Sequence, residues 1–209
     1  MMTSLFIPYA EERTIVAQST FKIIYGIGWV FIAIIRIPAR WRARSNQIKV
    51  DQKDAREKFL LAQGALVIGV LPLVYIFTPW LNFAHYKLRA WAGWTGTVSF
   101  AVGLWLLWRA HADLGRNWSD SLQLRQEHQL ITSGIYRYIR HPMYAFAWLL
   151  GIAQALLLPN WIVGLSGLAS IALFYFLRMP REEQMMLDQF GEAYRAYMQR
   201  TGRVIPRLK

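Results

Sequence analysis

Long apolar blocks, separated by basic segments, constrain the fold of this 209-residue chain more than any other feature. A helix needs ~20 apolar residues to cross the ~30 Å hydrocarbon core of a bilayer, and the blocks are of that length or slightly shorter. They lie at about 14–37, 59–77, 90–108, 142–158 and 161–177. They predict an all-α, polytopic membrane protein with about five transmembrane helices. Because the blocks and their connections use nearly the whole chain, we expect a single domain over 1–209.

The C-terminal end of the chain refines this prediction. Only Pro159-Asn160 joins the last two blocks, which predicts a tight helical hairpin. From Pro180 to Arg200, apolar residues recur at spacings of three and four, as on one face of an amphipathic helix. Proline suits the first turn of a helix, because the N–H group that it lacks is unpaired there anyway. We therefore expect a separate, cytoplasmic surface helix over this stretch.

The basic residues predict the orientation in the membrane. Most of the 24 lysines and arginines lie in three segments, at 36–58, 109–140 and 178–209, which alternate with segments poor in basic residues. The positive-inside rule places all three in the cytoplasm if the N-terminus is outside and the C-terminus is cytoplasmic. The same rule accounts for the formal net charge of +12, so we expect no nucleic-acid partner. Acidic residues before the first block argue against a cleavable signal peptide.

Two polar segments on the predicted cytoplasmic side carry the candidate chemistry, and the first ends in Arg140-His141-Pro142. A proline there is well placed to begin a membrane helix, whose unpaired N–H groups form an anion site. Together with Arg140 and His141, the helix start suits a small anionic group at the membrane surface. In the alternative interpretation, Arg140 anchors to lipid phosphates and His141 caps the helix. The residues alone leave both interpretations open.

The second polar segment begins at Arg178 and contains the pair Glu182-Glu183. Carboxylates near a helix start interact favourably with the helix dipole, and this alone explains the pair. Arg178 lies four residues before Glu182, so the two share a face if the helix is continuous, but Pro180 lies between them. An arginine at the end of an apolar span either binds a substrate or has a structural role. The chain has no cysteine, and its histidines show no metal-binding spacing, so we expect no metal site.

Taken together and in order, these motifs resemble the isoprenylcysteine carboxyl methyltransferase family. The similar part is 114–206, and its motifs are Arg140-His141-Pro142-x-Tyr144, Glu182-Glu183, Phe190-Gly191-Glu192-x-Tyr194-x-x-Tyr197 and Ile205-Pro206. The resemblance implies an integral membrane methyltransferase that uses S-adenosylmethionine and acts on a lipophilic small molecule or a lipid-modified substrate among membrane lipids. The short form of the chain resembles prokaryotic members, which implies the inner (cytoplasmic) membrane.

The resemblance also implies which residues form the site. Arg178 and Glu182 would be catalytic, with Arg178 facing the nucleophilic group of the acceptor. The cofactor would be held by His128, Gln129, Leu130, Ile131, Tyr136, His141, Pro142, Met143, Tyr144 and Glu182. A carboxylate acceptor of isoprenylcysteine type needs no general base, and Arg178 would hold it by a charge-assisted hydrogen bond. An amine or thiol acceptor would need a base, for which a glutamate or His141 is the candidate.

Three alternatives stay open at this point. The first is a methyltransferase that acts on a phospholipid or another lipid amine. The second is a sterol-type membrane reductase that uses NADPH, because a helix start binds the anionic groups of either cofactor. The third is a membrane protein that keeps the motifs as a scaffold without catalysis, because a fold does not by itself imply a function.

Overall fold

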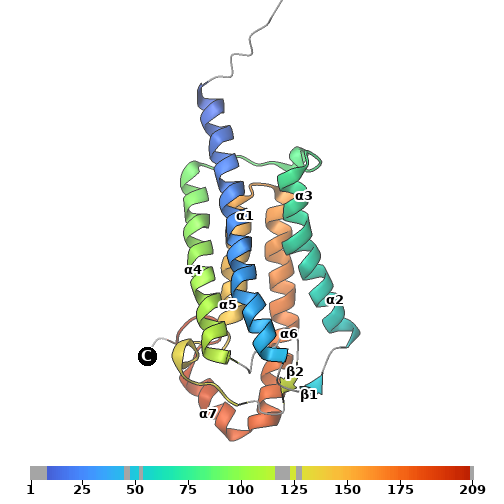
Figure 1. The fold of residues 1–209 in the computed structure, drawn as a ribbon, viewed down its shortest axis with the longest axis vertical. Helices are drawn as coiled ribbons and strands as arrows, with labels where there is room; N and C mark the ends of the chain where they lie inside the picture. Colours follow the sequence, from blue (N-terminus) through green and yellow to red (C-terminus); the bar gives the residue numbers. More distant parts are fainter. Residues whose placement is uncertain (1–8, 45–47, 52–53, 116–122, 126–128, 208–209) are drawn as a thin grey trace, which may run out of the picture.

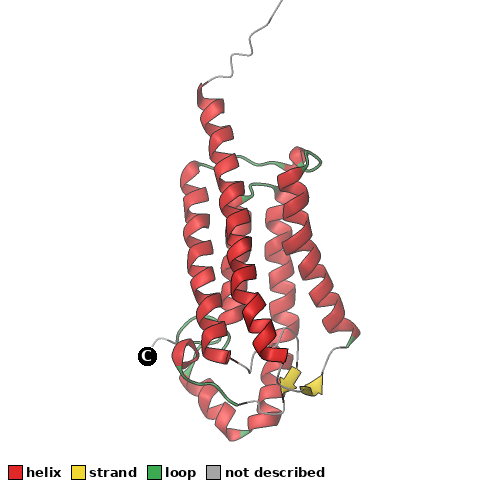
Figure 2. Ribbon diagram, in the orientation of Figure 1, coloured by secondary structure: helices red, strands yellow, loops and turns green. Residues whose placement is uncertain are grey.

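The computed structural model describes residues 9–44, 48–51, 54–115, 123–125 and 129–207. In this part of the chain, helical rods stand side by side and a shorter helix turns back at one end of the bundle (Figures 1 and 2). The first rod is α1 (Tyr9–Arg44), and the second consists of α2 (Ala55–Gly64), a π-helical segment (Ala65–Val70) and α3 (Leu71–Phe77). The third and fourth rods are α4 (Ala90–Leu114) and α5 (Pro142–Leu157). The fifth rod is a π-helical turn (Trp161–Leu165) continued by α6 (Ser166–Phe190). The shorter helix is α7 (Glu192–Arg200).

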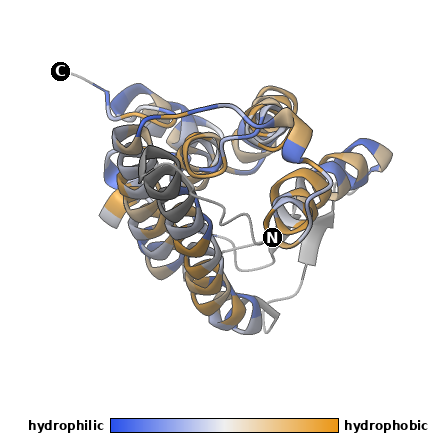
Figure 3. Cartoon of the chain, turned by 90° about the horizontal axis from the view of Figure 1, so that it is seen from above, coloured by the Kyte–Doolittle hydropathy of each residue, from blue (hydrophilic) through white to orange (hydrophobic). Residues whose placement is uncertain are grey.

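The predicted all-helical membrane fold is confirmed. Four rods are long and apolar enough to cross a membrane, namely Gln18–Arg42, Ala55–Phe77, Ala90–Leu114 and Trp161–Phe190. The remaining rod, α5, is apolar but shorter, and it packs against both α4 and α6. Many large apolar side chains on the rods are exposed, as in helices that face lipid. Seen from above, the rods are hydrophobic along much of their length (Figure 3).

The predicted hairpin between the last two blocks is also present, and Asn160 explains its tightness. Its side-chain oxygen accepts hydrogen bonds from the backbone N–H groups of Ile162 and Val163, both at 3.1 Å. Its Nδ2 donates to the Leu81 carbonyl at 2.6 Å. The fully buried amide thus caps the start of the fifth rod and fastens a distant loop to it.

The prediction of a separate surface helix that begins at Pro180 is wrong. Helix α6 runs through Pro180 to Phe190, and the chain turns only at Gly191, where α7 begins. Proline removes one hydrogen bond from a helix interior, but α6 is held there by ion pairs to other elements on both sides of Pro180. Gly191 has a φ of +53°, a conformation that glycine adopts without the steric penalty of other residues. Arg178 and Glu182 therefore lie on one continuous helix.

Two short strands were not predicted. Strand β1 (Ile48–Asp51) pairs antiparallel with β2 (Gln123–Arg125), within segments that the sequence indicated only as basic loops. A short 3-10 helix (Gly134–Arg137) then leads into α5. The described parts of the three basic segments lie at the same end of the bundle, around the end of α6 (Figure 1).

The bundle core contains a polar link. Tyr25 of α1 donates from its hydroxyl to Gln154 Oε1 on α5 at 2.8 Å, and Gln154 Nε2 donates to the Val163 carbonyl at 2.8 Å. Both side chains are buried. In an apolar environment each polar group needs an internal partner, so this link ties α1, α5 and the fifth rod together.

Candidate functional site

A cavity of about 930 Å³ opens at the end of the bundle where α6 meets α7 and continues between the rods. Its charged end is lined by residues of α1, the 129–144 segment, α6 and α7, including Arg36, Arg40, Tyr136, His141, Arg178 and Glu182. Its apolar part lies between α1, the second rod, α5 and α6, and includes Trp29, Ile32, Gly64, Ile68, Leu150 and Ile171. The cavity therefore suits a ligand, or a pair of ligands, with both polar and greasy parts.

The structure brings the predicted site residues together in this one cavity. Arg178 and every predicted cofactor residue that the structure describes line it, namely Gln129, Leu130, Ile131, Tyr136, His141, Pro142, Met143, Tyr144 and Glu182. His128, which was also predicted, lies outside the described residues. Their shared location is a finding; that they hold S-adenosylmethionine stays a prediction.

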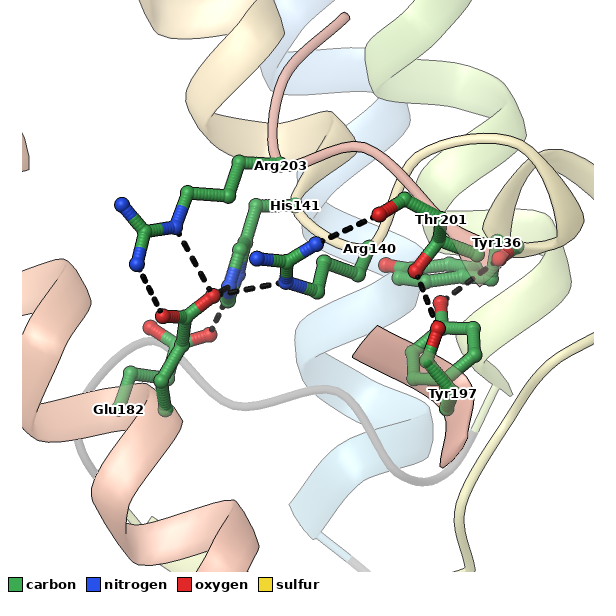
Figure 4. Close-up of polar contacts among 8 residues, drawn as sticks. Tyr136, Arg140, His141, Glu182, Tyr197, Thr201 and Arg203 are labelled. Atoms are coloured by element: carbon green, nitrogen blue, oxygen red, sulfur yellow. Dashed lines mark hydrogen bonds and ion pairs between the residues drawn. The ribbon is translucent and has the colours of Figure 1, made fainter. Parts of the chain in front are cut away.

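His141 links the start of α5 to α6. Its ring is buried, with Nδ1 3.6 Å from Glu182 Oε1 and Nε2 3.3 Å from Glu183 Oε1 (Figure 4). Burial alone would lower the pKa of His141, but hydrogen bonds and charge from the two carboxylates raise it above its ordinary value. The imidazolium form is therefore favoured. His141 is the N-cap residue of α5, but its side chain makes no capping hydrogen bond, so the interpretation that the imidazole caps the helix does not hold.

Glu182 faces the cavity, and its two oxygens have different neighbours. Oε1 lies near His141, and Oε2 accepts a hydrogen bond from the Tyr144 hydroxyl at 3.0 Å. Its side chain is still 30% exposed, which leaves room for a ligand group beside it. A carboxylate with this exposure is suited to receive a cationic group.

Glu183 also contacts His141, but it is held by two arginines and has a structural role. Arg140 Nε donates to its Oε1 at 2.7 Å, and Arg203 Nη2 donates to its Oε2 at 2.9 Å (Figure 4). Arg140 also donates from Nη1 to the Thr201 carbonyl at 2.7 Å. With a side chain only 8% exposed, Arg140 is not placed to anchor lipid phosphates. This cluster fastens the segment before α5 to α6 and to the C-terminal tail.

The segment before α5 is also held by groups that the sequence analysis did not single out. Asp113 Oδ2 of α4 accepts from the Ile135 backbone N–H at 2.8 Å, and the Tyr197 hydroxyl of α7 donates to the Tyr136 carbonyl at 2.7 Å. Gly134, with a φ of +60°, lies so close to Asp113 that a Cβ there would meet the carboxylate at 2.2 Å. Burial raises the pKa of Tyr136 well above its ordinary value, so its phenol stays neutral.

Arg178 has a partner that sequence reasoning missed. Its Nε lies 3.0 Å from Glu57 Oε1, and its guanidinium carbon lies 4.8 Å from the centre of the Phe174 ring. Glu57, in the first turn of α2, is fully buried. One turn further along α6, Arg181 pairs with Asp54 at 2.8 Å on the exposed side of the same contact. No local pattern signals these pairs, because their partners lie more than a hundred residues apart.

Fold and site together define a polytopic membrane protein with a cavity that is charged at one end and apolar at the other. Within that class, the model of the isoprenylcysteine carboxyl methyltransferase family matches residues 94–188, from α4 to α6. The match supports the family that the motifs indicated. Glu57 and Arg203 lie outside the matched residues.

Curated relatives are similar over about two thirds of this chain. The protein-S-isoprenylcysteine O-methyltransferase of Dictyostelium discoideum is 30% identical over 142 residues, which cover 66% of this chain and 58% of the relative. The human protein of that name is 29% identical, covering 65% of this chain and 51% of its own. Protein-S-isoprenylcysteine O-methyltransferase B of Arabidopsis thaliana is 28% identical, covering 68% of this chain and 72% of its own. The chain thus spans between about half and three quarters of the length of these relatives.

The fold has a counterpart among solved structures. The structure of the eukaryotic intramembrane Ras methyltransferase ICMT matches with a TM-score of 0.55 and 24% identity, over 88% of this chain and 62% of that one. The match supports the helical membrane architecture described above.

Proposed function

We propose that this chain is an integral membrane methyltransferase that moves a methyl group from S-adenosylmethionine to the carboxylate of a lipophilic acceptor of isoprenylcysteine type. One observation carries the proposal: the predicted cofactor residues and Arg178 line the charged end of the same cavity whose other part is apolar. A polar cofactor and a greasy acceptor can thus meet inside the bundle. The family of the relatives supports the reaction class.

The donor groups at the charged end fit the cofactor. Glu182 suits its ammonium group, because one carboxylate there is partly exposed beside the cavity. The start of α5 at Pro142, next to a charged His141, suits its carboxylate. Leu130, Ile131 and other apolar lining residues suit its adenine. When bound, the cofactor supplies an electrophilic methyl group on a sulfonium.

The apolar part of the cavity fits the acceptor chain. A Cβ placed at Gly64 or Gly69 would meet no atom within 4 Å, so the second rod leaves open space on its cavity side. Helix α1 packs mainly against α4 and α5, and α2 packs mainly against α6, so this space lies between two separately packed rods. Arg178 at its charged end would hold the acceptor carboxylate, which needs no general base for an in-line displacement.

The orientation follows from the charges in the same proposal. The charged end of the cavity is surrounded by the basic segments, so it would face the cytoplasm, with the N-terminus outside and the C-terminus inside. In a prokaryotic cell the host bilayer would be the inner membrane. The cofactor would enter from the cytoplasm and the acceptor from the bilayer.

Calorimetry on the detergent-purified protein tests the cofactor. We expect saturable binding of S-adenosylmethionine, no binding of NADPH, and an affinity for S-adenosylmethionine that falls at least ~10-fold in Glu182→Ala and His141→Ala. Arg181→Gln is the matched control, because it removes a charge from α6 outside the cavity lining and leaves the affinity unchanged. Binding of NADPH instead would favour a reductase, and binding of neither would contradict the proposal.

A further inference from the structure

Glu57 is a buried carboxylate that the cavity chemistry described so far does not use. It is 0% exposed, and neither of its oxygens accepts a hydrogen bond within the described part of the chain. The nearest positive charge is the Arg178 guanidinium, whose Nε lies 3.0 Å from Oε1 without the alignment of a hydrogen bond. A buried carboxylate is retained only if its charge is compensated. Arg178 is therefore the counterion of Glu57.

Arg178 stands between this carboxylate and the cavity. It lines the cavity, whereas Glu57 does not. Its side chain is 12% exposed, and its guanidinium lies over the Phe174 ring. Within the described residues, Glu57 is the one ion-pair partner of Arg178. One edge of the guanidinium is thus taken by Glu57, and the other nitrogens remain for a ligand in the cavity.

We propose that Glu57 is a positioning residue that holds Arg178 and offsets part of its charge, so that an acceptor carboxylate is oriented without being bound too strongly to react. The inference rests on the proposed function. In the reaction, an acceptor carboxylate oxygen forms a bond to the methyl carbon while the carbon–sulfur bond breaks. The bonding pair goes to sulfur, no proton moves, and the product is a neutral ester.

The physical reason is that the carboxylate loses charge on the way to the transition state. An arginine with no other counterion would stabilise the fully charged ground state more than the partly neutralised transition state, and this raises the barrier. A second carboxylate behind the arginine weakens that excess stabilisation and keeps the guanidinium in place. Removing it makes the acceptor bind more tightly and react more slowly.

The test measures kcat and KM for Glu57→Gln with S-adenosylmethionine and a small prenylcysteine carboxylate such as N-acetyl-S-farnesylcysteine. We expect kcat to fall about 10-fold, KM for the acceptor to fall several-fold, and the affinity for S-adenosylmethionine to stay unchanged. The control is Arg181→Gln, which breaks the exposed neighbouring ion pair between α2 and α6 and should change neither constant. A merely structural role for Glu57 would raise KM together with any fall in kcat.

A second variant keeps the inference testable if Glu57→Gln does not fold. Glu57→Asp retains the charge but withdraws it by one methylene, so kcat and KM should both fall to a smaller extent. Unchanged constants, or a KM that rises, in whichever variant is folded would overturn the role of Glu57. A wild-type protein that does not methylate the carboxylate at all would instead count against the proposed function, so the two failures are distinguishable.

Discussion

The carboxylates on the two sides of α6 are partnered very differently. Glu183 faces the segment before α5 and the C-terminal tail, and it is contacted by Arg140, His141 and Arg203. Glu57 faces α6 from α2, and Arg178 is the one ion-pair partner that the structure describes for it. On the first side, three partners together compensate the charge of Glu183. On the second side, the charge of Glu57 is compensated by one arginine among the described residues. Loss of a single partner should therefore matter more at the α2 contact than around Glu183.

The largest effect is expected when Arg178 is removed. In Arg178→Met the buried Glu57 carboxylate keeps no counterion, and we expect the protein to lose about 3–5 kcal/mol of stability along with its methyl transfer. The double variant Glu57→Gln/Arg178→Met should recover most of the stability and none of the activity. Thermal unfolding in detergent measures both. Additive losses in the double variant would show that the two charges do not depend on each other.

Removing Glu183 should have a smaller effect. Glu183→Gln leaves Arg140 buried, but the glutamine can still accept hydrogen bonds and Thr201 still binds the guanidinium. We expect a loss of about 2–3 kcal/mol with little change in intrinsic affinity for S-adenosylmethionine in the folded fraction. The neighbouring Glu182→Gln should lower that affinity and cost less stability than Glu183→Gln, because the Glu182 side chain is 30% exposed. Equal effects of the two variants on affinity would contradict the assignment of separate roles.

The stability of the cluster around Glu183 should depend on pH through His141. The pKa of His141 is raised in the folded protein, so the imidazolium contributes stability that is fully present below its unfolded pKa of about 6.5. That contribution is lost as pH rises through the folded pKa. We expect the unfolding midpoint to fall as pH rises above neutrality, and to fall less in His141→Gln. A slope that is the same in both proteins would show that His141 stays neutral when folded.

The smallest effect is expected at the exposed end of the α2 contact. Arg181 and Asp54 form an ion pair in which the Asp54 side chain is 50% exposed, and exposed pairs contribute little. Arg181→Gln should leave the unfolding midpoint and the activity at wild-type values, with Asp54 still capping α2. A clear loss of stability would mean that the position of α2 depends on this pair rather than on Glu57.

The sequence predicted the parts of this molecule that local patterns encode. Apolar block length indicated the rods, and the short joint that contains Asn160 predicted the hairpin. The spacing of motifs from Arg140 to Tyr197 indicated residues that do line one cavity. The single domain over 1–209, the orientation and the roles of the cavity residues stay predictions.

Other features could not be predicted because tertiary contacts decide them. Proline at position 180 is a plausible helix start by local rules, yet ion pairs on both sides of it keep α6 continuous and move the break to Gly191. Glu57 looked like one more residue of a basic loop, and its pairing with Arg178 joins positions far apart in the chain. Asp113 was missed for the same reason.

The chemical form of the transferred methyl group distinguishes a carboxyl methyltransferase from an amine methyltransferase. Purified protein is incubated with S-adenosylmethionine that carries a radioactive methyl group. One reaction contains N-acetyl-S-farnesylcysteine as the acceptor, and a second contains phosphatidylethanolamine. A carboxyl methyl ester releases its label as volatile methanol in base, whereas a methylated amine keeps it. We expect base-labile label on the prenylcysteine, and no such label in Arg178→Met. Base-stable label on the lipid amine, with none on the carboxylate, would contradict the proposed function.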